Sequence, residues 1–247
     1  MIKLIKTELI KIQWKLVILI ILIDVLVSSI LAINSVNDYK EMFVPDWNTL
    51  YFQEVMLHAM FFFPLLTGIF AALICSYEHK NRVWKQILTL PYSRLAIYFS
   101  KFIAIIIILL IVQLSFLLGY IITGYSGYKI QLAGIIPWKT VVFGVVAGYF
   151  AIFPLVALQL WLSTKFESFS RALILNIFMV IPNIVITGFQ SYIGAWIPYS
   201  SAYYAMFPQG INLSPRVEWK SFFLITLVTF IFYLVKGWKS FSQKDWI

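Results

Sequence analysis

Charged side chains are scarce in this chain of 247 residues, where they make up 12% of the sequence against 62% hydrophobic residues. A soluble domain carries about 25% charged residues. So few charges cannot cover a water-facing surface, and we therefore expect lipid to be the main solvent. The net charge of +9 then indicates membrane topology and anionic lipid headgroups, because the basic residues flank apolar runs. A nucleic-acid partner is not expected.

Sequence motifs for metal binding and catalysis are also missing. The single cysteine, Cys75, excludes an intramolecular disulfide and a thiolate metal site. No G-x-x-x-x-G-K-[ST], H-E-x-x-H or G-x-S-x-G motif occurs, so we expect no nucleotide, no metal and no catalytic residue in this chain. The two histidines, His58 and His79, are expected on opposite sides of the membrane, and the predicted spans hold a single central acid, Asp24.

Six apolar segments are long enough to cross a membrane, which takes about 20 mostly apolar residues. The predicted fold class is therefore an all-α integral membrane protein with a single transmembrane domain over residues 1–247. Inner connections carry 14 basic residues and outer connections 5, which predicts that both termini are cytoplasmic. The predicted spans are 16–33, 59–77, 102–122, 141–162, 172–193 and 221–236.

Two further segments have membrane-associated patterns. Residues 1–15 place apolar side chains at helical spacing among lysines, which predicts an amphipathic helix in the inner interface. The alternative is a cytoplasmic extension of the first span. Residues 194–220 are rich in aromatic residues, and this predicts a re-entrant hairpin before the last span.

The cytoplasmic segment 77–101 predicts a short amphipathic helix over 80–90. Its apolar face holds residues 83, 84, 87 and 88, and its polar face holds residues 82, 85, 86 and 89. Pro91 is expected to stop this helix, and Ser93 can cap the next one. The segment is interpreted either as a rigid device for docking a protein or as a positively charged loop that only fixes topology.

The same segment resembles the first cytoplasmic loop of small type-2 ABC transporter permeases. Its Trp-Lys pair and its Pro-x-Ser-Arg step are most similar to those of lantibiotic and bacteriocin self-immunity permeases, and the phenol-soluble modulin exporter permeases have a similar build. The rest of the chain is similar in architecture only. The residues that carry the resemblance are Glu78, Asn81, Arg82, Trp84, Lys85, Leu90, Pro91, Ser93, Arg94 and Lys101.

The resemblance implies the membrane subunit of an ATP-driven exporter in the bacterial cytoplasmic membrane. Such permeases pair with a second permease, identical or related, and with ATP-binding-cassette ATPase subunits that carry the ATP and Mg. The implied substrate is an amphipathic or antimicrobial-type peptide, and the alternative function is a non-transporting immunity factor or assembly scaffold. Trp84 would anchor the ATPase, and the full set of coupling residues would be Glu78, Arg82, Trp84, Lys85, Pro91 and Arg94.

Polar side chains inside the predicted spans are candidates for a substrate path. An acid such as Asp24 costs roughly 2.5–3.5 kcal/mol near the middle of a span, so it should face the protein interior. No basic residue is expected at its depth, and Ser28, Ser29 or Gln113 could bond to it. Asp24 is interpreted either as a contact for a cationic substrate or as an interhelical hydrogen bond. The other candidates, which could equally be structural, are Gln113, Gln159, Asn176 and Asn183.

Overall fold

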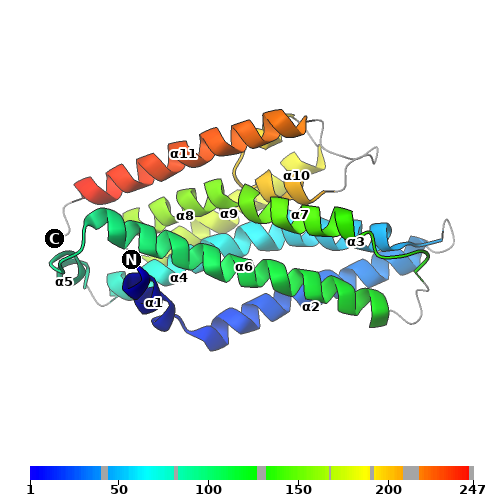
Figure 1. The fold of residues 1–247 in the computed structure, drawn as a ribbon, viewed down its shortest axis with the longest axis horizontal. Helices are drawn as coiled ribbons and strands as arrows, with labels where there is room; N and C mark the ends of the chain where they lie inside the picture. Colours follow the sequence, from blue (N-terminus) through cyan, green and yellow to red (C-terminus); the bar gives the residue numbers. More distant parts are fainter. Residues whose placement is uncertain are drawn as a thin grey trace.

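The structure, a computed structural model, describes residues 1–39, 44–80, 83–126, 132–166, 168–189, 192–207 and 217–244. Within these residues six helices are long and apolar enough to cross a membrane, which confirms the predicted fold class. The long helices run side by side in one bundle, and both chain termini lie at the same end as α5 (Figure 1). We call this the terminal end of the bundle and the opposite one the distal end.

Five of the six membrane-spanning helices are longer than the predicted spans, whereas α9 ends at Gly188, before the predicted end at residue 193. Two of the six change their helical geometry along their length. Helices α3, η1 and α4 follow one another without a break, and η1 is a π-helical turn; helices α7 and α8 are separated only at Ile152, just before Pro154. The elements are α1 (Ile2–Ile10), α2 (Trp14–Tyr39), α3 (Trp47–Leu57), η1 (His58–Phe62), α4 (Phe63–Lys80), α5 (Trp84–Leu88), α6 (Arg94–Ser126), α7 (Trp138–Ala151), α8 (Phe153–Lys165), α9 (Phe169–Gly188), η2 (Tyr192–Trp196), α10 (Ser201–Met206) and α11 (Trp219–Gln243).

The second membrane-spanning helix begins at Trp47, well before the predicted start at residue 59. Polar residues lower the hydropathy of this stretch, and the one acid within it, Glu54, is buried rather than exposed. Asp46 caps the helix by accepting a hydrogen bond from Thr49 N at 2.8 Å. Partial burial raises the pKa of Asp46, but the hydrogen bonds from Thr49 and Asn48 outweigh burial and hold that pKa below its ordinary value.

Helix α1 is separate from the first span, because the chain leaves helical geometry between Lys11 and Gln13. The Trp14 indole donates from Nε1 to the Leu9 carbonyl at 2.9 Å and so satisfies one of the last carbonyls of α1. The residue that α1 buries is Glu8. This helix therefore packs on the bundle through a charged side chain as well as through its apolar stripe.

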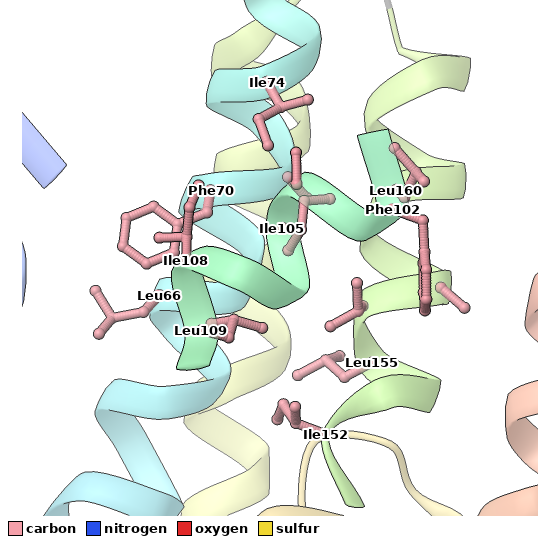
Figure 2. Packing of buried hydrophobic residues seen from close by; sticks show 14 of the residues in the cluster. Leu66, Phe70, Ile74, Phe102, Ile105, Ile108, Leu109, Ile152, Leu155 and Leu160 are labelled. Carbon is pink, nitrogen blue, oxygen red and sulfur yellow. The ribbon is translucent and has the colours of Figure 1, made fainter. Parts of the chain in front are cut away.

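Helix α6 forms the centre of the apolar core near the terminal end. Its side chains lie between those of α4 and those of α8 (Figure 2). Lipid is as apolar as these residues, so the stabilisation comes mainly from close packing rather than from transfer out of water. The labelled contact residues are Leu66, Phe70, Ile74, Phe102, Ile105, Ile108, Leu109, Ile152, Leu155 and Leu160.

The segment predicted as a re-entrant hairpin contains two short helices, η2 and α10. All six residues of α10 are buried, and the helix packs against α7. Ser201 Oγ donates to the Ala151 carbonyl at 2.6 Å, and Ser200 Oγ donates to the Gly194 carbonyl at 2.7 Å. Residues 208–216 of the predicted hairpin lie outside the described residues.

Candidate coupling site

Four charged side chains meet at the terminal end of the bundle. We call Glu8, Lys11, Glu78 and Lys101 the ion cluster. Lys101 is fully buried, and its Nζ lies 2.9 Å from Glu8 Oε2 and 2.8 Å from Glu78 Oε1. Lys11 Nζ lies 2.8 Å from Glu78 Oε1 and 3.2 Å from Glu8 Oε1. Each cation contacts both carboxylates, so the two positive and two negative charges balance.

The ion cluster joins elements that are far apart in the sequence. Glu8 belongs to α1, Glu78 to the last turn of α4, and Lys101 to the first part of α6. The loop that carries α5 therefore has both of its ends attached to the same charged centre. Removing one partner of a buried ion pair lowers the free energy of unfolding by about 3–5 kcal/mol. The ion cluster therefore fixes these elements firmly to one another.

Glu78, one of the predicted coupling residues, lies inside the protein. Its side chain is fully buried, and Lys11 and Lys101 both bond to its Oε1 atom. Helix α4 continues to Lys80 and turns Glu78 toward α1 and α6, and the role of Glu78 in coupling remains a prediction. Glu78 therefore positions the loop instead of facing outward from it.

Trp84 holds α5 against the bundle. Its side chain is buried, and its Nε1 donates to His79 Nδ1 at 3.1 Å. Lys101 Nζ lies 5.2 Å from the centroid of the Trp84 ring, and the Phe241 ring lies 5.6 Å from it. A cation over an indole is stabilising. The aromatic surface of Trp84 is therefore packed within the chain, in agreement with its place on the predicted apolar face, and its role as the anchor of the ATPase remains a prediction.

The other side of α5 faces outward and forms an exposed surface that we call the docking face. Gln86 and Thr89 are exposed, in agreement with the predicted polar face, and the exposed surface continues beyond the helix. The docking face consists of Gln86, Thr89, Leu90 and Tyr92.

Helix α5 is shorter than the predicted helix over 80–90. It has five residues and ends at Leu88, so Pro91 lies in the exposed turn that follows and does not itself end the helix. Arg82 lies outside the described residues, and the side chain of Lys85 is not described either. The contacts predicted for these two basic residues therefore remain predictions.

The start of α6 is fixed by two hydrogen bonds near the docking face. Ser93 Oγ accepts from the Ala96 backbone N–H at 3.1 Å, which confirms its predicted capping role. Arg94 is exposed and donates from Nη1 to the Ser242 carbonyl near the end of α11. The loop is thus connected to the last membrane-spanning helix as well as to α4 and α6.

Asp24 has a basic partner, contrary to the prediction. Its Oδ2 and Oδ1 lie 2.9 and 3.2 Å from His58 Nδ1, and Ser28 Oγ donates to Oδ1 at 3.2 Å. All three side chains are buried. His58 was expected in an outer connection, but the early start of α3 at Trp47 carries it into the membrane-spanning part. Asp24 therefore has partners within the protein, and a role in substrate passage remains a prediction.

Two asparagines attach α9 to the interrupted second span. Asn176 Nδ2 donates to the Leu65 carbonyl, and Asn183 Nδ2 donates to the Met60 carbonyl, both at 2.9 Å. Pro64 has no N–H, so the Met60 carbonyl four residues earlier loses its usual helical donor. Asn183 supplies the missing hydrogen bond, which gives this predicted path residue a structural contact.

The two glutamines among the predicted path residues also bond within the protein. Gln159 Nε2 donates to Asn176 Oδ1 at 2.8 Å and also to the Tyr199 hydroxyl, and Gln113 Nε2 lies 3.4 Å from Met206 Sδ. Their Oε1 atoms have no hydrogen-bond partner among the described residues. These contacts match the structural alternative, and a role in substrate passage remains a prediction.

Sequence reasoning missed Glu8, the carboxylate that α1 contributes to the ion cluster. Glu8 is the one acid before Asp24 in a segment rich in lysine, and that isolation was an available signal. Lys101 belonged to the loop pattern, but its burial depends on three helices meeting. Sequence spacing along one helix cannot show such a meeting.

The sequence model of one known family matches residues 4–183, and it describes an ABC-2 family transporter protein. This match covers more than half of the chain and runs from α1 into α9. It therefore includes the ion cluster, α5 and the Asp24–His58 pair. Among curated proteins, none matches the chain. The extent of the family match settles the relationship: this chain belongs to the ABC-2 family of transporter proteins.

Proposed function

We propose that the chain is the permease subunit of an ATP-binding-cassette exporter, energised by a separate ATPase subunit at the terminal end of the bundle. The observation that carries this proposal is the family match over residues 4–183. In this family the membrane protein is the permease component, and ATP hydrolysis belongs to a separate subunit. ATP and Mg would accordingly bind to the partner.

The arrangement of the loop supports a mechanical role. The docking face points outward, whereas Trp84 on the same short helix packs against Lys101 and Phe241. Movement of a bound ATPase would therefore press on Trp84 and, through Lys101, on the ion cluster. Because the ion cluster connects α1, α4 and α6, the displacement would reach the membrane-spanning helices α4 and α6 together.

The docking face differs from the ATPase contact first expected from the sequence. Its centre combines the apolar Leu90 with the aromatic Tyr92, and Gln86 on α5 and Thr89 just after the helix add polar groups. Aromatic residues commonly dominate the energetics of protein interfaces. Arg82 and Lys85 would add electrostatic steering at its edge.

The proposed setting is the bacterial cytoplasmic membrane, with both termini in the cytoplasm and a second, identical or related permease as partner. The proposed substrate is an amphipathic or antimicrobial-type peptide, which rests on the resemblance of the loop to those of self-immunity permeases. One observation favours the alternative of a non-transporting immunity factor or scaffold. Three of the predicted path residues, Asn176, Asn183 and Gln159, donate their amide hydrogens to groups within the bundle.

The test is co-purification of the ATPase with a variant of the docking face. Leu90→Glu places a charge at the centre of the proposed interface and should abolish association. The matched control is Ile135→Glu, because Ile135 is 91% exposed and belongs to the connection between α6 and α7 at the distal end. Equal recovery of the ATPase with both variants would contradict the proposed docking face.

A further inference from the structure

We propose that Asp24, Glu54 and His58 form a proton-binding site inside the membrane-spanning part of the chain. This site is separate from the ion cluster: its members come from α2, from the end of α3 and from the first residue of η1. All three side chains are buried. Intramembrane ionisable residues are costly, so three of them together call for a functional explanation.

The imidazole of His58 is held in a defined orientation. Its Nδ1 lies 2.9 Å from Asp24 Oδ2, and its ring stacks between two phenylalanines. The Phe116 centroid lies 4.2 Å away with an interplanar angle of 18°, and the Phe63 centroid lies 5.2 Å away at 22°. Aromatic faces on both sides stabilise a cationic ring, and the carboxylate stabilises the same charged form.

Glu54 supplies a second carboxyl group. It lies four residues before His58, so the two side chains share one face of the helix. Glu54 Oε1 and His58 Nε2 are both buried and have no hydrogen-bond partner among the described residues. Two ionised carboxylates beside one imidazolium would leave an unbalanced charge, which costs several kcal/mol in a buried site. An arrangement without net charge that makes the 2.9 Å contact between Asp24 and His58 an ion pair has ionised Asp24, protonated His58 and Glu54 as the carboxylic acid.

The surrounding elements contribute no further cation among the described residues. Helix α2 adds hydroxyl groups, α3 adds one phenol, and α6 adds one phenol and one hydroxyl. A proton lost from His58 or Glu54, or gained by Asp24, therefore changes the net charge of the site directly. The polar and titratable neighbours are Ser28, Ser29, Tyr51, Tyr120 and Thr123.

The other histidine provides an internal reference. His79 Nδ1 accepts a hydrogen bond from Trp84 Nε1, so this nitrogen carries no proton. Its Nε2 lies 2.9 Å from the Ser163 carbonyl and must be the donor there. His79 is thus a neutral imidazole, whereas the proposal makes His58, the other histidine of the chain, an imidazolium.

Nitrogen NMR of the histidine-labelled full chain in lipid nanodiscs tests this assignment at neutral pH. One charged and one neutral imidazole are expected, and His79→Gln should remove the neutral signals alone. Asp24→Asn should convert His58 to the neutral form. A neutral His58 in the unsubstituted protein, or a His58 signal that Asp24→Asn leaves unchanged, would overturn the proposal.

Infrared spectroscopy tests the Glu54 proton independently. A protonated carboxyl band is expected at neutral pH, and it should disappear in Glu54→Gln. The matched control is Glu218→Gln, because Glu218 is exposed at the start of α11 and should not contribute to this band. A band that is absent from the unsubstituted protein, or that survives Glu54→Gln, contradicts the proposal. If a variant fails to fold, the spectra of the unsubstituted protein and of His79→Gln still decide whether His58 is charged.

Discussion

The two ends of the bundle are closed by different chemistry. At the terminal end, Lys101 is buried between two carboxylates. At the distal end, uncharged aromatic side chains connect the helices instead. The Tyr120 hydroxyl donates to the Trp47 carbonyl at 3.0 Å, and the Tyr51 hydroxyl donates to the Met206 carbonyl at 3.1 Å. The Tyr51 and Tyr120 rings also meet edge to face, with their centroids 5.6 Å apart.

This difference matters for transmission of force. Buried charges must remain paired, so displacing one member of the ion cluster displaces the others or costs several kcal/mol. An aromatic contact loses about 0.5–1.5 kcal/mol beyond its area when it separates. We therefore expect the terminal end to move as a unit and the distal end to tolerate small rearrangements.

The largest expected effect is that of Lys101→Met at the terminal end. This change keeps a long apolar stem but leaves Glu8 and Glu78 as neighbouring carboxylates with only Lys11 to balance them. The free energy of unfolding should fall by about 3–5 kcal/mol, seen as a lower Tm in detergent. The matched control is the exposed Lys239→Met, which should change stability by no more than about 0.5 kcal/mol. Equal losses of stability in Lys101→Met and Lys239→Met would contradict the special role of the ion cluster at the terminal end.

An intermediate effect is expected from overpacking at the distal end. A Cβ atom at Gly144 would lie 2.1 Å from the Tyr51 hydroxyl and 3.1 Å from the Met206 carbonyl oxygen. Gly144→Ala should therefore lower the free energy of unfolding by about 1–3 kcal/mol. Gly188→Ala is the control, because a Cβ atom there would meet nothing within 4 Å. If Gly144→Ala is as stable as the control, the distal contacts are looser than described.

A smaller effect should follow from Tyr51→Phe. The ring stays in place, and only the hydrogen bond to the Met206 carbonyl is lost. A loss of about 1 kcal/mol is expected in thermal unfolding. Tyr125→Phe, at an exposed ring, serves as the reference and should have no measurable effect. A loss as large as that of Lys101→Met would show that the distal end also depends on a single polar group.

The same contrast explains what the sequence could predict. Six apolar segments stood out because lipid-facing helices need continuous hydrophobic stretches, and the loop around Trp84 stood out by its pattern. The start of α3 was missed because its polar residues lower the hydropathy, although the acid among them, Glu54, is buried inside the protein. The Ser28 partner of Asp24 lies one turn away on the same helix and was among the predicted candidates. The His58 partner of Asp24 and the lysine partners of Glu78 were missed because these contacts join separate elements, whose meeting depends on tertiary packing.

The orientation of the two ends is tested without any change in stability. In a Cys75→Ser background, Val44→Cys at the distal end should react with an impermeant thiol reagent in intact cells. Gln86→Cys on the docking face should react only after the membrane is opened. Both positions are exposed in the structure, so accessibility within the protein is not limiting. Reversed labelling would place the docking face outside the cell and contradict an ATPase partner there.

The central claim is that the ion cluster transmits movement from the docking face to the spans, and Glu78→Gln tests it most directly. This variant keeps the size of the side chain and leaves the docking face unchanged. The measurement compares ATPase recovery with ATP turnover of the reconstituted complex. Unchanged recovery with turnover reduced to that of the ATPase alone is the predicted result. Unchanged recovery together with unchanged turnover would contradict the account.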